Sequence, residues 1–144
     1  MKQFKLFAAL FAVCFSFLFT SCNNNNEEVY ASIVGTWNAV KMEYLVNDVL
    51  EGSTNFADED VSLIYTFSEY EKYTSLTIEN GETDTYAGIY NISEDNKILT
   101  LLDSEGEVNI IFFIKKATEK ELVLDNTDTT MDGKFSSVYY FTRQ

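Results

Sequence analysis

The sequence predicts an all-β fold: a single eight-stranded antiparallel up-and-down barrel that follows a cleaved N-terminal signal segment. From residue 33 onward, apolar residues recur at every second position, the period that places side chains on one face of a strand. Turn signals separate these stretches at short, fairly even intervals. The chain contains no proline, a residue that commonly protects an open sheet edge. A sheet closed on itself is therefore favoured over a sandwich.

The first 21 residues have the features of an export signal. Two lysines precede an uncharged apolar stretch at 6–19, which is too short to span a bilayer core of about 30 Å comfortably. The stretch ends in FTSC at 19–22, which resembles the lipobox of bacterial lipoproteins. That resemblance implies that residues 1–21 are removed and that Cys22 carries the lipid, with several acyl chains giving stable anchoring. The alternative is an incidental thiol beside an ordinary cleavage point.

Four asparagines and two glutamates follow Cys22 and are too polar to pack. We therefore expect residues 22–32 to form a lipidated, hydrated tether and residues 33–144 to form the domain. Acidic residues soon after a lipidated cysteine resemble the surface-export signals of Bacteroidetes lipoproteins. The resemblance implies a protein that is lipid-anchored in the bacterial outer membrane. It favours a surface-facing location, and a periplasm-facing one stays open.

The first half of the domain contains one long connection between strands. The first strand is predicted at 34–46 and the second at 61–68, where large side chains occupy the odd positions. The connection, 47–60, holds Leu50 and Phe56 among acidic and small residues. We expect it to form a short helical turn or a lid.

The rest of the chain is predicted to meander through tight turns. Asn80-Gly81 is the strongest turn signal, because both positions tolerate the positive φ that a two-residue hairpin requires. Polar residues at 94–96, 104–106, 118–120 and 132–133 mark further turns. The remaining strands are expected at 72–79, 84–92, 97–103, 107–116, 121–126 and 134–143.

The charge of the chain excludes one class of partner. The full sequence has a formal net charge of −13. Without the two lysines of the leader, eight basic residues face twenty-three acidic ones, which places the mature protein near −15. Such a field repels nucleic acid and anionic lipid headgroups, so nucleic-acid binding is excluded. The sequence does not identify a protein partner.

The residue inventory argues against an enzyme. The chain has no histidine, and both cysteines lie at or before position 22. Ser-His-Asp and Cys-His constellations and histidine-ligated zinc sites are therefore excluded from the mature domain. Acidic clusters at 58–60, 103–107 and 125–132 are interpreted as solvated turns, since their spacing matches no calcium loop and nothing in their order selects a two-carboxylate glycosidase. We predict no catalytic residue, no metal and no cofactor.

The inward face of the predicted barrel is rich in aromatic residues. Following the alternation places Phe135 and Phe141 inward, together with aliphatic residues that include Leu76 and Ile78. Tyrosine hydroxyls in an enclosed space need hydrogen-bond partners, which water or a ligand provides. The alternative is a filled core whose tyrosines reach solvent at the rims. The candidate ligand-binding residues are Tyr65, Tyr86, Tyr90, Phe112 and Tyr139.

Three short motifs carry a resemblance to a family. IVGTW at 33–37, GIYNI at 88–92 followed by KILTL, and VYYFTR at 138–143 are together similar to the lipocalin-like lipoprotein domains of Bacteroidetes. The resemblance covers roughly residues 33–143 and implies a lipocalin-like barrel. It also implies that Trp37 closes one end of the barrel with the Arg143 guanidinium over its ring.

Together these observations predict a membrane-anchored protein that binds or carries a small apolar or amphipathic molecule in its barrel. The alternative is a non-enzymatic interaction module, such as an inhibitor or an accessory envelope lipoprotein, whose filled barrel displays its loops. The long connection at 47–60 motivates that alternative.

Overall fold

The computed structural model describes residues 32–144. Cys22, the leader and nearly all of the predicted tether lie outside the described residues. Within the described part of the chain, no helix is long and apolar enough to cross a membrane. The elements are β1 (Gly35–Val46), β2 (Val49–Asn55), the 3-10 turn η1 (Phe56–Asp58), β3 (Val61–Phe67), β4 (Lys72–Glu79), β5 (Glu82–Ile92), β6 (Ile98–Leu102), β7 (Val108–Ala117), β8 (Glu121–Thr130) and β9 (Gly133–Arg143).

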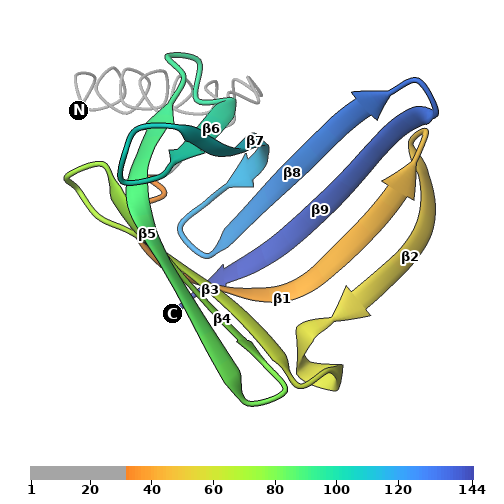
Figure 1. Cartoon of the computed structure of the whole chain (residues 1–144), viewed down its shortest axis with the longest axis horizontal. Helices are drawn as coiled ribbons and strands as arrows, with labels where there is room; N and C mark the ends of the chain where they lie inside the picture. Colours follow the sequence, from red (N-terminus) through yellow and green to blue (C-terminus); the bar gives the residue numbers. More distant parts are fainter. Residues whose placement is uncertain (1–31) are drawn as a thin grey trace, which may run out of the picture.

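Eight of the strands form a closed antiparallel ring. The sheet runs β2-β1-β3-β4-β5-β6-β7-β8-β9, and an additional β1–β9 pairing closes β1 and β3–β9 into a ring (Figure 1). Of the strands in residues 32–144, only β2 stands outside the ring, because it pairs with β1 and with no other described strand. The predicted eight-stranded up-and-down barrel is confirmed. Closure satisfies the backbone groups that an open meander would expose.

The long connection contains a strand that the sequence pattern did not predict. β2 lacks alternating apolar residues, and six of its seven residues are exposed. It is held by backbone pairing with the far half of β1, from Lys41↔Asn55 to Val46↔Val49. The expected short helical turn is present as η1. β8 also runs past the predicted end at 126, through polar residues that pair with β9 up to Thr130↔Gly133.

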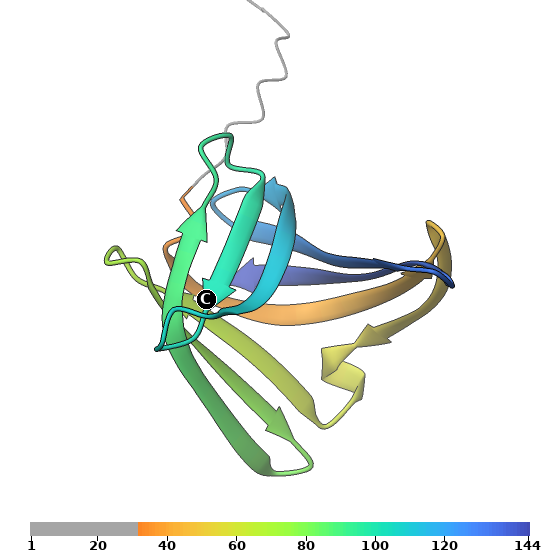
Figure 2. The ribbon, with the colours of Figure 1, turned by 45° about the horizontal axis from the view of Figure 1, so that its top comes forward.

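The strands pair completely only near one end of the ring. β1 and β3 pair at Gly35–Asn38, β5 and β6 at Ile89–Ile92, and β7 and β8 at Phe113–Ala117. Beyond these seams the ring separates into three groups, β3–β4–β5, β6–β7 and β8–β9–β1–β2, which diverge in Figures 1 and 2. We call the fully paired end the closed end and the other the open end.

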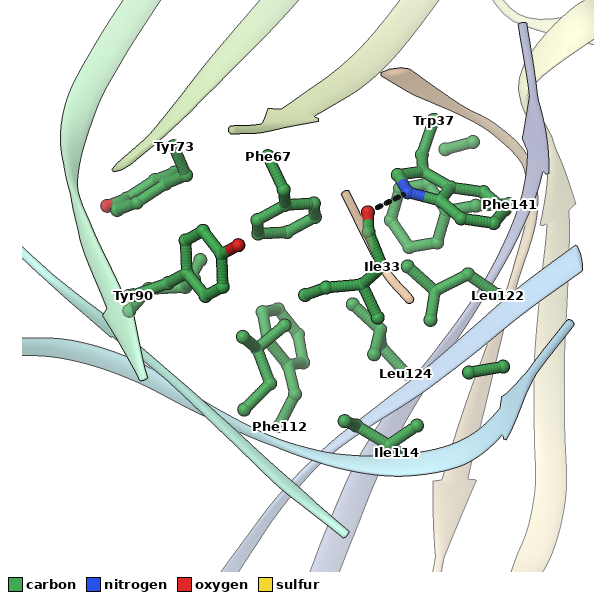
Figure 3. Close-up of a cluster of buried hydrophobic side chains, with 14 residues drawn as sticks. Ile33, Trp37, Phe67, Tyr73, Tyr90, Phe112, Ile114, Leu122, Leu124 and Phe141 are labelled. Carbon is green, nitrogen blue, oxygen red and sulfur yellow. Dashed lines mark hydrogen bonds between the residues drawn. The ribbon is translucent and has the colours of Figure 1, made fainter. Parts of the chain in front are cut away.

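The hydrophobic core lies at the closed end (Figure 3). Each large side chain buried there stabilises the fold by roughly 1.5–3 kcal/mol. The indole Nε1 of Trp37 donates a hydrogen bond to the Ile33 carbonyl at 2.7 Å, so its one polar atom is satisfied. The largest fully buried side chains are Trp37, Phe67, Phe112, Phe141, Leu99, Leu101, Leu122 and Leu124.

One part of the predicted inward set is wrong. Leu76 and Ile78 of β4 pair with Ile64 and Ser62, on the opposite face from the buried Tyr73. The mistake comes from the sequence of β4, whose inward positions after Tyr73 are the small polar residues Ser75 and Thr77. A prediction from apolar content alone therefore assigned residues of the outer face of this strand to the interior of the barrel.

Candidate functional site

A cluster of aromatic rings lies where the closed end passes into the open end. Tyr65 is its centre, with ring centroids 5.8 Å from Phe67, 6.4 Å from Phe112 and 5.7 Å from Phe141. Tyr139 joins it through Phe112 at 6.0 Å and Phe141 at 6.3 Å. These edge-to-face and stacked contacts fix the ring orientations. We call these five residues the aromatic floor.

Tyr65 and Tyr139 bring the only polar atoms into the aromatic floor. Burial, reinforced by the phenols of Tyr139 and Tyr73, raises the pKa of Tyr65 above its ordinary value, and no hydrogen bond contributes. Burial also raises the pKa of Tyr139, which the Ser137 hydroxyl partly opposes. Both phenols are therefore neutral at physiological pH and offer a donor and an acceptor.

The Tyr65 hydroxyl is not fully buried. Among residues 32–144, every fully buried polar side-chain atom has a hydrogen-bond partner. The Tyr65 ring is half-buried, and no group of residues 32–144 forms a hydrogen bond with its hydroxyl, so this oxygen keeps contact with solvent. A bound molecule that replaced the solvent there would gain a hydrogen bond without displacing a protein partner.

The structure brings together three of the five predicted ligand-binding residues. Tyr65, Phe112 and Tyr139 belong to the aromatic floor, although Phe112 is buried within it. Tyr90 is buried beside Phe67, with ring centroids 5.1 Å apart, and donates its hydroxyl to the Ser68 carbonyl at 2.8 Å. Tyr86 is 64% exposed and lies apart, on the stretch of β5 that has left β6.

A β-bulge adds residues that strict alternation misses. The register of β1 against β9 shifts between Ala39 and Lys41. Beyond the bulge, Met42 pairs with Tyr139 and therefore shares its face, and Tyr44 follows two positions on. Continuing the alternation from Trp37 would have placed Lys41 on that face instead. Nothing in the local sequence marks the bulge.

The inner face of the open end carries no positive charge in the described part of the chain. Register places Glu79 and Asp84 on the same face as Tyr86 and Ser75, and Asp128 on the same face as Leu124. The basic residues lie elsewhere. On the outer face are Lys41, Lys72, Lys115, Lys116 and Lys134, and at the closed end are Lys97, Lys120 and Arg143. An anionic group beside the aromatic floor would find no counter-charge there.

Arg143 closes the other end of the barrel. Its guanidinium carbon lies 4.2 Å from the centroid of the Trp37 ring, the arrangement expected from the sequence. The same group donates to the carbonyls of Val34 at 2.6 Å, Ser32 at 2.9 Å and Glu119 at 2.7 Å. It thus joins the last strand to the N-terminal segment and to the β7–β8 turn.

Comparison with solved structures finds distant similarities. The siderocalin Ex-FABP is 12% identical over 77% of this chain and 73% of its own, with a TM-score of 0.45. A complex of bovine odorant-binding protein with undecanal is 15% identical over 82% and 77%, with a TM-score of 0.46. Lobster apocrustacyanin A1 is 14% identical over 77% and 60%, with a TM-score of 0.47. These likenesses are too distant to indicate a ligand.

Family comparison gives a more direct result. Among curated proteins, none matches the chain by sequence. The family model described as a lipocalin-like domain matches residues 33–124, which extend from the β1 tryptophan motif through the first half of β8. The chain belongs to the lipocalin-like domain family.

Proposed function

We propose that this protein binds a small, uncharged, apolar or amphipathic molecule on the aromatic floor. The observation that carries the proposal is the Tyr65 hydroxyl, which lies among packed rings, keeps contact with solvent and has no hydrogen-bond partner among residues 32–144. Aromatic faces with a few convergent polar groups are the usual composition of a small-molecule site.

The charge distribution supports an uncharged ligand. A carboxylate beside Tyr65 would lose hydration without gaining a cation, and it would face the acidic residues Glu79, Asp84 and Asp128. A hydroxyl, carbonyl or ether group has no such penalty and matches the neutral phenols of Tyr65 and Tyr139.

The chemistry of the aromatic floor supports binding and not catalysis. Acid–base catalysis works best with a group whose pKa lies near the working pH. Burial moves the pKa of Tyr65 and of Tyr139 further from neutrality. These phenols are therefore suited to donate hydrogen bonds and not to exchange protons.

A titration with matched headgroups tests the proposal. Trp37, the only tryptophan of the chain, is the register partner of Tyr65, so its fluorescence reports on the aromatic floor. We expect saturable quenching by 1-decanol and much weaker quenching by decanoate. The Tyr65→Phe variant should bind 1-decanol about two- to thirteenfold more weakly, since it loses one hydrogen bond worth about 0.5–1.5 kcal/mol.

Tyr70→Phe is the matched control. Tyr70 is 83% exposed in the β3–β4 turn, so removing its hydroxyl should leave the affinity unchanged. Equal affinity of Tyr65→Phe and the native protein, or preference for decanoate, would contradict the proposal. Native mass spectrometry of gently purified protein should show a bound neutral mass.

We also propose that lipid on Cys22 anchors the protein in the outer membrane. The motif at 19–22 supports this location, together with the polar run that follows it. Cys22→Ser should release the protein from the envelope fraction. Continued sedimentation of the variant with membranes would contradict lipidation.

The free edge of β2 favours a second candidate function, which is protein binding. Among residues 32–144, β2 pairs with β1 alone, and Val49 and Leu50 on it are 60% and 56% exposed. An exposed apolar edge is a template for a strand from a partner. Crosslinking in intact cells tests this candidate. Loss of a specific product in Leu50→Lys would support it, and an unchanged pattern would leave ligand binding as the function.

A further inference from the structure

A groove of about 410 Å³ lies on the outer face of the barrel, over the seam between β7 and β8. Its position follows from register, because Phe113 and Asp125 pair across the seam and alternate with the core residues Phe112 and Leu124. We call it the outer groove. Its lining consists of Lys97, Phe113, Ile114, Lys115, Asp125, Thr127 and Lys134. We infer that the outer groove is a second binding site, for a small organic anion with an apolar body.

Positive charge is concentrated in the outer groove. Three of the eight basic residues in the described chain line it, namely Lys97, Lys115 and Lys134. They come from the β5–β6 turn, from β7 and from β9, and only the fold brings them together. On a protein with a net charge of −13, such a concentration has no counterpart on the inner face of the open end.

Backbone hydrogen bonds fix two of these lysines at the margins of the groove. The Lys97 N–H donates to Ser93 Oγ and Asp95 Oδ1, each at 3.2 Å, and its carbonyl accepts from the Ile114 N–H at 2.8 Å. The Lys134 N–H donates to Asn47 Oδ1 at 3.1 Å, and its carbonyl accepts from the Asn47 N–H at 2.8 Å. A ligand therefore meets side chains whose attachment points are already ordered.

The buried Asp125 carboxylate lies beside the Lys115 ammonium and leaves that ammonium accessible. Asp125 is 6% exposed, accepts from Thr127 Oγ1 at 2.8 Å and lies 3.4 Å from the ammonium of Lys115. Thr127 in turn shares a 2.7 Å hydrogen bond with Ser136. The Lys115 side chain is 58% exposed, so an incoming anion reaches its ammonium before the carboxylate.

The other two ammonium groups leave positive charge at the rim of the outer groove. Lys134 pairs with Asp48 at 2.6 Å, but the Asp48 side chain is 73% exposed and its charge is well hydrated. Lys97 takes part in none of the ion pairs formed among residues 32–144. The lining of the outer groove thus holds three ammonium groups and one carboxylate, that of Asp125, while Asp48 and Asp95 lie outside the lining, beside Lys134 and Lys97.

An apolar wall determines the kind of anion. Phe113 is 43% exposed although it is a large aromatic residue, and its ring forms this wall. A ring or short chain packed on Phe113 would be removed from water, whereas inorganic phosphate would gain nothing from it. The site therefore fits an aromatic or short aliphatic carboxylate or sulfonate.

This inference stands apart from the proposed function. The two sites lie on opposite faces of the sheet, and they are expected to bind ligands of different charge: an uncharged molecule on the aromatic floor and an anion in the outer groove. An experiment can therefore disprove binding of an uncharged molecule at Tyr65 without disproving binding of an anion at Lys97, and the reverse.

Chemical-shift mapping with naphthalene-2-sulfonate tests the site, with 2-naphthalenemethanol as the uncharged probe. We expect saturable shifts of the Phe113, Lys115 and Thr127 amides with the sulfonate only. The double variant Lys97→Gln/Lys134→Gln should bind about fivefold more weakly, from the loss of two exposed charge contacts. Lys72→Gln/Lys120→Gln changes the net charge equally outside the groove and should keep the native affinity.

Three outcomes would overturn the inference. One is an equal loss of affinity in the control double variant, because the effect would then reflect net charge. Another is equal binding of the uncharged probe. The third is a shift pattern centred on Tyr65 and Tyr139 in place of Phe113. Thermal unfolding of both double variants establishes that they remain folded, since all four lysine side chains lie outside the core.

Discussion

The closed end and the open end of this barrel are made from the same strands but are held together differently. At the closed end, each strand of the ring pairs with both neighbours, and Trp37, Leu99 and Leu122 are completely excluded from solvent. At the open end, three seams have parted and residues such as Tyr86 and Tyr44 are 64% and 41% exposed. The comparison indicates that stability resides mainly at one end, which leaves the other free to vary its contacts.

The largest expected effect comes from removing the side chain that anchors the closed end. Trp37→Ala should lower the free energy of unfolding by about 3–5 kcal/mol, because it leaves a cavity and removes the ring beneath Arg143. Urea denaturation followed by circular dichroism measures the change.

Tyr86→Ala is the matched substitution at the open end. Tyr86 is mostly exposed, so its loss should change the free energy of unfolding by about 0.5 kcal/mol or less. Comparable destabilisation by Trp37→Ala and Tyr86→Ala would show that stability is spread evenly over the barrel.

A pair of glycines sharpens the same comparison at the level of the backbone. At Gly88, an added Cβ would overlap the Leu102 carbonyl oxygen and approach the Tyr73 ring, at the point where β5 begins to pair with β6. Gly88→Ala should therefore destabilise by about 1–3 kcal/mol. At Gly52 of β2, an added Cβ meets nothing, so Gly52→Ala should be neutral or stabilise by about 0.4–1 kcal/mol.

Thermal unfolding of the two alanine variants, measured side by side, checks this pair. A Gly88→Ala protein as stable as the native one would mean that the β5–β6 seam relaxes easily. The closed end would then be less rigid than its burial indicates.

Local sequence was sufficient to predict the ring because each of its strands has its own alternating pattern of apolar residues. In β7, for example, Ile110, Phe112 and Ile114 alternate, and the core indeed contains Phe112 and Ile114. β2 had no such signal. Its residues are polar or exposed, and only its pairing with β1 makes it a strand. A strand that is held only by backbone pairing with its neighbour needs no alternating apolar residues, so its sequence does not reveal it.

The candidate site was less predictable, because it depends on where strands stop pairing. The sequence indicated inward aromatic residues, and Tyr65, Phe112 and Tyr139 do cluster. It did not show that Tyr86 lies beyond the β5–β6 seam, since the end of a seam is set by register and twist over the whole barrel. The outer groove could not be predicted from the sequence either, because Lys97 and Lys134, which both line it, are distant in sequence.

The smallest expected effect concerns an ion pair beside the β1 bulge, between the two ends. Lys41 donates to Glu43 Oε1 and the Tyr140 hydroxyl donates to Glu43 Oε2, each at 2.6 Å. Lys41 and then Tyr140 hold the pKa of Glu43 below its ordinary value, while the hydrogen bond to Glu43, helped by burial, raises the pKa of Tyr140 to about 12. Glu43→Gln should therefore return the Tyr140 pKa toward about 10.

The pH dependence of the free energy of unfolding follows from the directions of these two pKa shifts. The contribution of Tyr140 is complete below its unfolded pKa of about 10 and is lost as pH rises through its folded value of about 12. The contribution of Glu43 is complete above its unfolded pKa and is lost as pH falls through the lowered folded value. A pH titration followed by tyrosinate absorbance measures the pKa of Tyr140. The difference between the native protein and Tyr140→Phe isolates the contribution of Tyr140, and Tyr86→Phe serves as the control. Should Tyr140 titrate at the same pH with and without Glu43, the bulge would be loosely held, and the rigid part of the barrel would end at Ala39.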